Sequence, residues 1–215
     1  MPQAFVRLTA ASSPEFEQLI AIYQDAIDPS EQKTAAELAA MLADRRYMAL
    51  VSITDAIVSG FSISYFPDNA EFWLLEYMAV ASHIRSSGLG AAIFNETYRA
   101  GAMRSCGAIM LLEVDQPGGS TNASNDTAAR FRFYRRIGCR QIAGLNYVLP
   151  LKSNGAPPPM MLLTYSLPSV NTVSKSKIKN WLTILYGDVY HCSRTDVRIA
   201  AMTAHLPETL LVLPF

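Results

Sequence analysis

The sequence predicts an α/β (α+β) fold: a mixed, mostly antiparallel central sheet flanked by helices, with a helical C-terminal extension. Three apolar or alternating runs of strand length, at residues 47–54, 57–66 and 72–80, follow one another with short polar turns between them, which is typical of an antiparallel meander. Before and after these runs in the sequence, segments with apolar residues at three- and four-residue spacing predict helices. Strands and helices do not alternate regularly along the chain, as they would in a doubly wound parallel sheet.

The composition narrows the class of partner. Half of the 215 residues are hydrophobic and 17% are charged, as in a globular protein. Eighteen basic residues balance eighteen acidic ones without a basic run, which argues against nucleic acid or an anionic membrane surface as a partner. Binding of a small molecule in a pocket is therefore favoured.

Targeting and cysteine patterns favour a cytoplasmic protein. The first residues lack a basic start followed by a long apolar region, and no apolar run reaches the ~18 residues of a membrane span. Three widely spaced cysteines, with no CxxC pair and no histidine at zinc-ligand spacing, indicate free thiols in a reducing compartment. We expect no metal site.

The N-terminal part carries clear start signals for helices. Residues 4–9 read as a first strand, and Ser13 is an N-cap in front of a helix that opens with proline. Thr34 and Glu37 have the spacing of a capping box, which predicts a second, short helix. The three meander strands follow.

After the meander, helices and strands alternate. The pattern predicts a helix from Gly88 to about Arg104, a buried strand at residues 109–114, and a helix at 128–137 that Gly138 ends at its C′ position. Residues 139–142 and 160–167 supply the closing strands. The first domain accordingly spans residues 1–167.

The tail, residues 168–215, is predicted to be a helical extension. Apolar residues at 178, 181, 182 and 185 form a stripe on one helix, and the run Ser193 to Asp196 caps a second. Packing of this helical pair on the domain, a lid over substrate and a contact that forms a homodimer are the three interpretations.

Residues 85–90, Arg-Ser-Ser-Gly-Leu-Gly, form a candidate phosphate site. They follow a predicted strand and open a predicted helix, where glycines let the backbone approach an anion and the first helical N–H groups have no intrahelical partner. A Walker loop is excluded because Ala91 and Ala92 follow Gly90, and a dinucleotide fingerprint is excluded because Ile93 occupies the position of its third small residue.

Three motifs together resemble the GNAT family of N-acetyltransferases. The segment from Glu76 into the loop at 85–90 fits the family's Gln/Arg-x-x-Gly-x-Gly/Ala signature, and the strand Leu-Leu-Glu-Val at 111–114 follows in the family's order. Tyr134 and Gly138 fit its Tyr-x-x-x-Gly-Phe signature, except that Cys139 replaces the aromatic residue. The resemblance covers about residues 4–167 and leaves the tail unexplained.

The resemblance implies acetyl-coenzyme A as the acyl donor, bound by backbone amides. The pyrophosphate-binding role falls on Arg85, Ser86, Ser87, Gly88, Leu89 and Gly90. In the family, the end of the fourth strand binds the pantetheine amides and polarises the thioester carbonyl through fixed N–H groups. Here that strand end is Met78, Ala79 and Val80.

Two further roles follow from the same resemblance. Tyr134 is at the position of the group that hydrogen-bonds or protonates the coenzyme sulfur, although a tyrosine that only packs beside the coenzyme is the alternative. Many members place an asparagine seven residues before this tyrosine. Thr127 occupies that position here, with Asn125 two residues earlier, so either could contact the coenzyme.

Glu76 and Glu113 are the candidates for the general base. A carboxylate inside an apolar strand is costly unless it is paired or functional. Glu76 is the first choice, and Glu113 on the adjacent strand could be the base or an anchor for a cationic substrate. A structural role for each is the third alternative, and a bulge nearby would decide which face Glu76 occupies.

The sequence therefore predicts an acetyl-CoA-dependent N-acetyltransferase that acts by direct attack in a ternary complex. The acceptor would be the amine of a small molecule or peptide. A catalytically degenerate domain that binds acyl-CoA and regulates a partner is the alternative. Fold and motifs do not identify the acceptor.

Overall fold

The fold was determined from a computed structural model, which describes all residues except 1–2, 30, 106, 108, 117–124 and 151–158. Contacts group the chain into two compact units, Met1–Gly107 and Ala108–Phe215.

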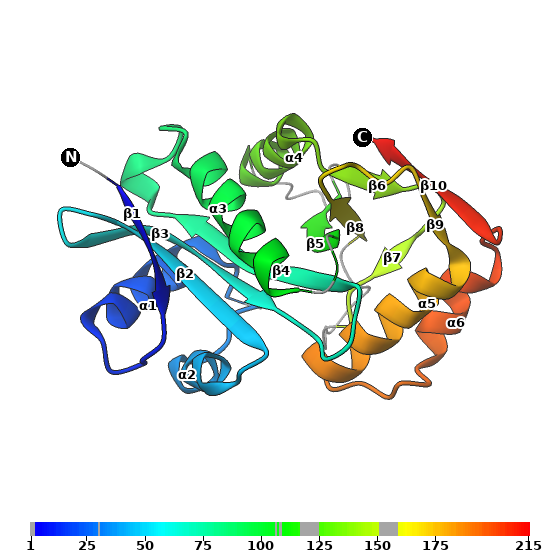
Figure 1. Ribbon diagram of the computed structural model, residues 1–215, viewed down its shortest axis with the longest axis horizontal. Helices are drawn as coiled ribbons and strands as arrows, with labels where there is room; N and C mark the ends of the chain where they lie inside the picture. Colours follow the sequence, from blue (N-terminus) through cyan, green and yellow to red (C-terminus); the bar gives the residue numbers. More distant parts are fainter. Residues whose placement is uncertain (1–2, 30, 106, 108, 117–124, 151–158) are drawn as a thin grey trace. The chain divides into compact units, whose positions relative to one another are not determined.

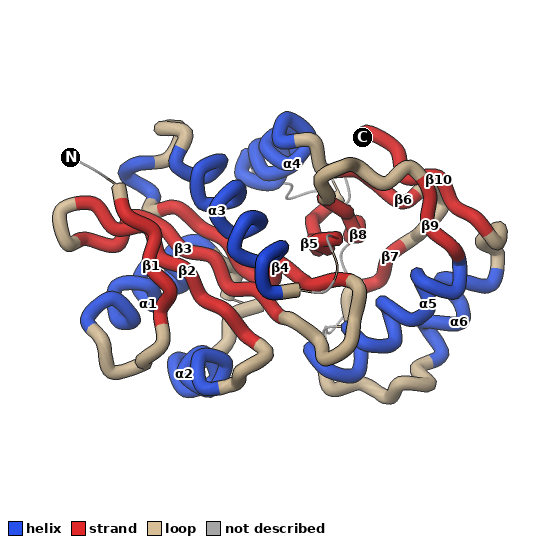
Figure 2. The backbone as a smooth tube through the Cα atoms, in the orientation of Figure 1, coloured by secondary structure: helices blue, strands red, loops and turns tan. Residues whose placement is uncertain are grey.

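The first unit contains a four-stranded antiparallel sheet in chain order. Strands β1 (Ala4–Leu8), β2 (Tyr47–Thr54), β3 (Ile57–Tyr65) and β4 (Phe72–Val80) pair in sequence, and the meander can be followed in Figure 2. A two-residue turn joins β2 to β3, with positive φ at both Asp55 and Ala56, which matches the twist of an antiparallel hairpin. The first strand and the predicted meander are confirmed.

Both predicted N-terminal caps are present. Helix α1 (Pro14–Ala26) begins after Ser13, whose side chain accepts a hydrogen bond from the Phe16 N–H at 3.3 Å. Helix α2 (Ala35–Ala43) begins with the full capping box, in which Thr34 and Glu37 each satisfy a backbone N–H of the other. These caps satisfy N–H groups that a helix start leaves unpaired.

The alternation of side chains along β3 gives the sheet two buried faces. Phe61 and Ile63 belong to the core that α1 and α2 cover. On the other face lies α3 (Leu89–Arg104), which runs along β3 and β4 in Figure 1. There the Ser62 and Thr97 hydroxyls form a buried hydrogen bond of 2.6 Å, and a Cβ on Gly60 would lie 2.6 Å from Ile93 Cδ1. The helix therefore packs very close to the strand.

Among its described residues, the second unit contains six strands, and their pairings with one another are antiparallel. The order is β5 (Ile109–Asp115), β8 (Pro159–Tyr165), β6 (Arg140–Ile142), β10 (Thr209–Pro214) and β9 (Thr172–Ser174), and β7 (Tyr147–Val148) also pairs with β8. The predicted mostly antiparallel arrangement with flanking helices is confirmed.

Helix α4 (Asn125–Ile137) starts three residues before its predicted start and ends as predicted. Gly138 has a φ of 95°, its N–H donates to the Arg135 carbonyl, and the Cys139 N–H donates to the Tyr134 carbonyl. This pair of bonds is a Schellman motif, which explains why a glycine follows the helix.

The tail contains the predicted helices and also two strands that the prediction missed. Helix α5 (Lys175–Ile184) continues into a π-helical turn, η2 (Leu185–Val189), and packs against α6 (Val197–Ala204), which Asp196 caps. The predicted helical extension is confirmed, and the tail adds β9 and β10, which pair with each other, while β10 also pairs with β6. Short strands of this kind are stabilised by partners distant in sequence, so local pattern does not reveal them.

Among the helices that the structure describes, none is both long enough and apolar enough to cross a membrane.

We predict that Gly101→Ala destabilises the first unit by roughly 1–3 kcal/mol, because an added methyl group overpacks the core. Its Cβ would lie 2.4 Å from Cζ2 of Trp73, which is fully buried. Urea unfolding followed by circular dichroism measures the change. Helix propensity alone would stabilise the variant by about 1 kcal/mol, so a gain in stability would contradict the close contact.

Candidate functional site

The predicted phosphate loop lies where a strand ends and a long helix begins. A short 3-10 turn, η1 (Ser82–Ile84), follows β4, and α3 starts at Leu89. Ser86 and Gly88 have φ values of 66° and 88°, so the chain turns twice through the left-handed region in front of the helix. Residues 85–88 are all exposed.

Backbone N–H groups are concentrated at this helix start. Gly88 is the N-cap and has no side chain to cap the helix, although its carbonyl accepts from the Ala91 and Ala92 N–H groups at 3.1 and 3.2 Å. A Cβ on Gly88 would meet nothing within 4 Å, so its surroundings are open. The positive end of the dipole of a 16-residue helix faces this opening, an arrangement suited to a phosphate group.

The strand end next to the loop is held by β3. Met78, Ala79 and Val80 pair with Ser62, Phe61 and Gly60, and the Ala81 N–H donates to the Ser59 carbonyl at 3.0 Å. Ala79 is buried, whereas Met78 and Val80 are half-buried. The backbone leading into the loop therefore has a fixed position within the first unit.

Glu76 lies at a β-bulge. The register changes between Ile63, which pairs with Tyr77, and Ser64, which pairs with Leu75, so Glu76 is the inserted residue without a partner on β3. A bulge breaks the alternation of side chains and turns one of them in a new direction. Glu76 thus does not simply share a face with Met78 and Val80.

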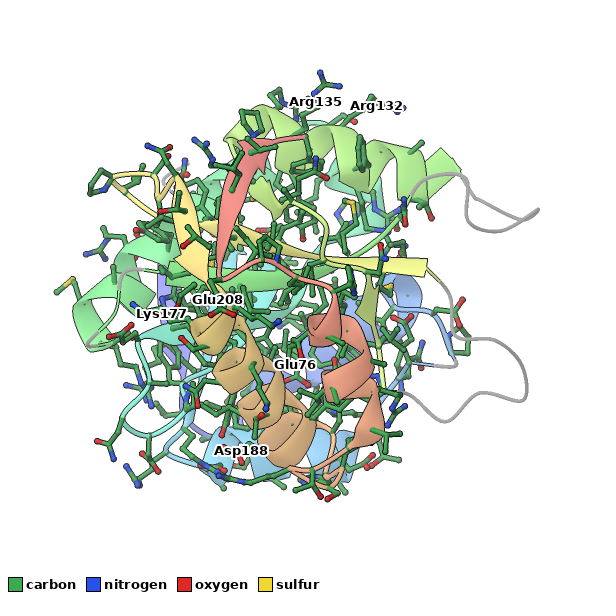
Figure 3. All side chains as sticks on the ribbon, turned by 90° about the vertical axis from the view of Figure 1, so that its right-hand side faces the viewer. Glu76, Arg132, Arg135, Lys177, Asp188 and Glu208 are labelled. Atoms are coloured by element: carbon green, nitrogen blue, oxygen red, sulfur yellow. The ribbon has the colours of Figure 1, made fainter. Side chains whose placement is uncertain are left out.

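The Glu76 side chain, labelled in Figure 3, is only 4% exposed. Its Oε1 lies 3.4 Å from Lys33 Nζ, whereas its Oε2 has no hydrogen-bond partner of good geometry among the residues that the structure describes. Burial raises the pKa of Glu76, and Lys33 with the nearby Tyr47 and Tyr77 hydroxyls lowers it only in part. The carboxyl is buried and only half satisfied.

Glu113 has very different surroundings. Its Oε1 accepts a hydrogen bond from the Tyr147 hydroxyl, and its Oε2 accepts one from the Tyr190 hydroxyl. Burial, and then the Glu113 charge, raise the pKa of Tyr147, so this phenol stays protonated as a donor. Tyr147 lies on β7 and Tyr190 follows η2, so the carboxylate connects the tail to the sheet of the second unit.

Tyr134 lies on α4 and is half-buried, with its ring 5.1 Å from that of Phe133 in an edge-on contact. Burial raises the pKa of Tyr134, and the neighbouring Cys139 adds to this effect, so the phenol is a proton donor at neutral pH. Thr127 is half-buried in the first turn of α4. Asn125 is the first residue of α4, and its side chain lies outside the described part of the structure.

The predicted site residues thus fall into two groups. Glu76, the strand end and the loop at 85–90 follow one another in the first unit, whereas Glu113, Thr127 and Tyr134 belong to the second. Sequence reasoning missed Lys33 and Tyr190, the charge partner of Glu76 and a hydrogen-bond donor to Glu113. Neither lies in a motif, and only the folded chain brings each to its carboxylate.

The second unit also has a mostly apolar open pocket of about 420 Å³. Its single charged lining residue, Arg132, projects away from α4 together with Arg135 in Figure 3. None of the predicted site residues lines the pocket, which is formed by Gln116, Ala128, Phe131, Arg132, Gln141, Met161 and Phe215. Within the described residues, no group of three His, Cys, Asp or Glu side chains could hold a metal ion.

Comparison with known proteins gives matches among solved structures only. No protein-family model and no curated protein matches the sequence. A candidate acetyltransferase of the GNAT family from Bacteroides thetaiotaomicron matches with a TM-score of 0.66 and 19% identity, covering 87% of this chain and 98% of its own.

Two further solved structures match over most of their own length. An aminoglycoside 6'-N-acetyltransferase complexed with coenzyme A has a TM-score of 0.59 and 18% identity, with 76% of this chain and 97% of its own covered. The ribosomal-protein-S18-alanine N-acetyltransferase from Escherichia coli has a TM-score of 0.56 and 16% identity, with 79% and 96% covered. The chain has the fold of GNAT acetyltransferases, and the resemblance found in the sequence is confirmed at that level.

We predict that Tyr190→Phe destabilises the protein by about 1.5–3 kcal/mol, the range for a hydrogen bond to a charged group. The variant removes one donor to the Glu113 carboxylate and changes little else. Urea unfolding of this variant, of Glu113→Gln and of the double variant forms a mutant cycle that isolates the pair. If the double variant loses as much free energy of unfolding as the two single variants together, a direct interaction between Tyr190 and Glu113 is contradicted.

Proposed function

We propose that the protein is an N-acetyltransferase that transfers an acetyl group from acetyl-coenzyme A to an amine in a ternary complex. The observation that carries this proposal is the loop at residues 85–90. It opens a 16-residue helix whose N-cap, Gly88, is a left-handed glycine without a side-chain cap, and residues 85–88 are exposed, in a chain with the GNAT fold. A solved neighbour of the same fold is complexed with coenzyme A, which supports the same donor here.

The coenzyme would be bound mainly by backbone. Arg85 to Gly90 would bind the pyrophosphate through N–H groups and the helix dipole, as polyanions bind at other helix starts. The amides of Met78 to Val80 would bind the pantetheine arm and polarise the thioester carbonyl. Thr127 or Asn125 would add a side-chain contact from α4. The pairing of this strand end with β3 supports the role, because a fixed backbone has little to reorganise during reaction.

The reaction needs a neutral amine and a proton for the leaving thiolate. Glu76 would remove a proton from the acceptor's ammonium group, and the amine nitrogen would then attack the thioester carbon. The C–N bond forms, the C–S bond breaks, and the electron pair leaves on sulfur. Tyr134, whose phenol is protonated at neutral pH, would donate its proton to this thiolate, and the second proton lost by the amine nitrogen would restore the phenol.

The geometry favours Glu76 over Glu113 as the base. A base needs a lone pair that can reach the substrate proton, and Oε2 of Glu76 has no well-formed hydrogen bond among the described residues. Both oxygens of Glu113 accept phenolic hydrogen bonds, which supports a structural role for that residue. The acceptor's identity is open, since neighbours with this fold carry names as different as an aminoglycoside and a ribosomal-protein acetyltransferase.

We predict that the protein binds acetyl-CoA and releases free thiol with at least one member of a panel of amines. Calorimetric titration measures binding, and a thiol reagent measures turnover. Gly88→Ala should weaken binding, because alanine is strained at a φ of 88° at the helix start. Binding without turnover on any acceptor would favour the degenerate acyl-CoA-binding domain, and no binding would refute both.

We predict that Tyr134→Phe lowers kcat by about 10²–10⁴-fold, the usual contribution of general acid catalysis. Acetyl-CoA affinity should change little, because the ring and its packing remain. Steady-state kinetics and calorimetry on the same preparation separate these effects. Tyr98→Phe on α3 is the matched control and should keep wild-type turnover; unchanged turnover in Tyr134→Phe would refute the acid role.

A further inference from the structure

Lys33 is brought to Glu76 by tertiary structure. It lies between α1 and α2, where its backbone N–H donates to the Tyr23 hydroxyl at 2.8 Å. Its Nζ lies 3.4 Å from Glu76 Oε1, and its side chain is 27% exposed, whereas that of Glu76 is 4% exposed. The lysine therefore closes one side of the carboxyl and still reaches the surface.

The other carboxylate oxygen points to a ligand. Oε2 of Glu76 is buried and accepts no hydrogen bond of good geometry from the described residues, although the Tyr47 and Tyr77 hydroxyls lie near the carboxyl. A buried acceptor of this kind costs free energy until a donor meets it. An ionised carboxylate only accepts hydrogen bonds, so the missing group is an N–H or O–H donor, and a cationic one gains most.

Aromatic rings around the pair also favour a cation. Lys33 Nζ lies 6.0 Å from the centre of the Tyr77 ring, and the Tyr23 ring meets that of Tyr77 edge-on at 5.1 Å. Ring faces attract ammonium groups through their quadrupole. The Tyr77 ring therefore helps to hold the Lys33 ammonium group beside the carboxylate.

We propose that Lys33 is the positioning residue of an amine-binding carboxylate: its ammonium group holds Oε1, which leaves Oε2 to accept an N–H of the acceptor. The acceptor class is then an amine that arrives as an ammonium ion. This inference rests on the proposed acetyltransferase function. It adds a residue, Lys33, that the loop and Tyr134 do not imply.

The charges around Glu76 determine in which direction the loss of Lys33 would shift the pKa of Glu76. Burial raises its pKa, and Lys33 is the largest influence that lowers it, ahead of the Tyr47 and Tyr77 hydroxyls. Further titratable groups near these phenols are Tyr23, Glu31, Asp44 and Tyr65. Glu76 works as a base only when deprotonated, so activity is lost as the pH falls through its pKa in the folded protein. Removal of the lysine charge should move this loss to higher pH.

The first test is the pH profile of kcat/KM with the best primary amine of the panel. In Lys33→Met, the pH at which kcat/KM falls on the acid side of the profile should rise by roughly 1–3 units, because the loss of an opposite charge at this distance usually shifts a pKa by that amount. Lys33→Arg should restore this pH to near its wild-type value, because the positive charge is kept. Lys179→Met, at an exposed lysine of α5, is the matched control and should leave the profile unchanged.

The second test does not depend on turnover. Carbon-13 NMR of protein labelled at glutamate carboxyls follows the titration of Glu76, whose signal is assigned by its loss in Glu76→Gln. The Glu76 titration should move up in Lys33→Met and stay near wild type in Lys33→Arg. An unmoved titration in Lys33→Met overturns the inference even if amines are acetylated. A moved titration without turnover by the wild type supports the Lys33 pairing and refutes the proposed function.

Discussion

The close packing of α3 on β3 is the constraint on which the candidate site depends. A Cβ at Gly60 on β3 would overlap Ile93 of α3, and the Ser62 and Thr97 hydroxyls share a buried hydrogen bond across the same interface. A Cβ at Gly101 on α3 would likewise overlap Trp73 on the neighbouring strand β4. Small residues and one polar pair thus fix how near the helix comes to the sheet. The start of α3 is thereby held close to the end of β4, and the loop at 85–90 has a defined place to present its N–H groups.

The two candidate carboxylates show how local environment separates roles. Glu76 is the inserted residue of a bulge, buried, and paired on one oxygen with a lysine. Glu113 is held on both oxygens by phenols, one of which comes from the tail. Oε2 of Glu76 can therefore accept a hydrogen bond from a ligand, whereas both oxygens of Glu113 are used within the protein. Equal residue types on comparable strands therefore support different proposals.

The tail, residues 168–215, is joined to the preceding strands of the second unit by strand pairing and a hydrogen bond, which an appended pair of helices would lack. Strand β10 pairs with β6, and Tyr190 donates to Glu113. The division predicted at residue 167 remains a prediction, and the tail's strand pairing and hydrogen bond argue that residues 168–215 fold together with the strands before them.

Local sequence determined the elements whose signals lie within a few residues. Ser13, the Thr34 capping box and Gly138 mark helix ends because caps satisfy backbone groups of the same helix, and the meander followed from alternation and short turns. The loop motif and its two companions in sequence likewise identified the fold that the solved structures confirm. Only the tertiary structure placed Lys33 on Glu76, Tyr190 on Glu113 and β10 on β6. Those contacts join residues more than forty positions apart, and their energies depend on burial and register, which no local pattern encodes.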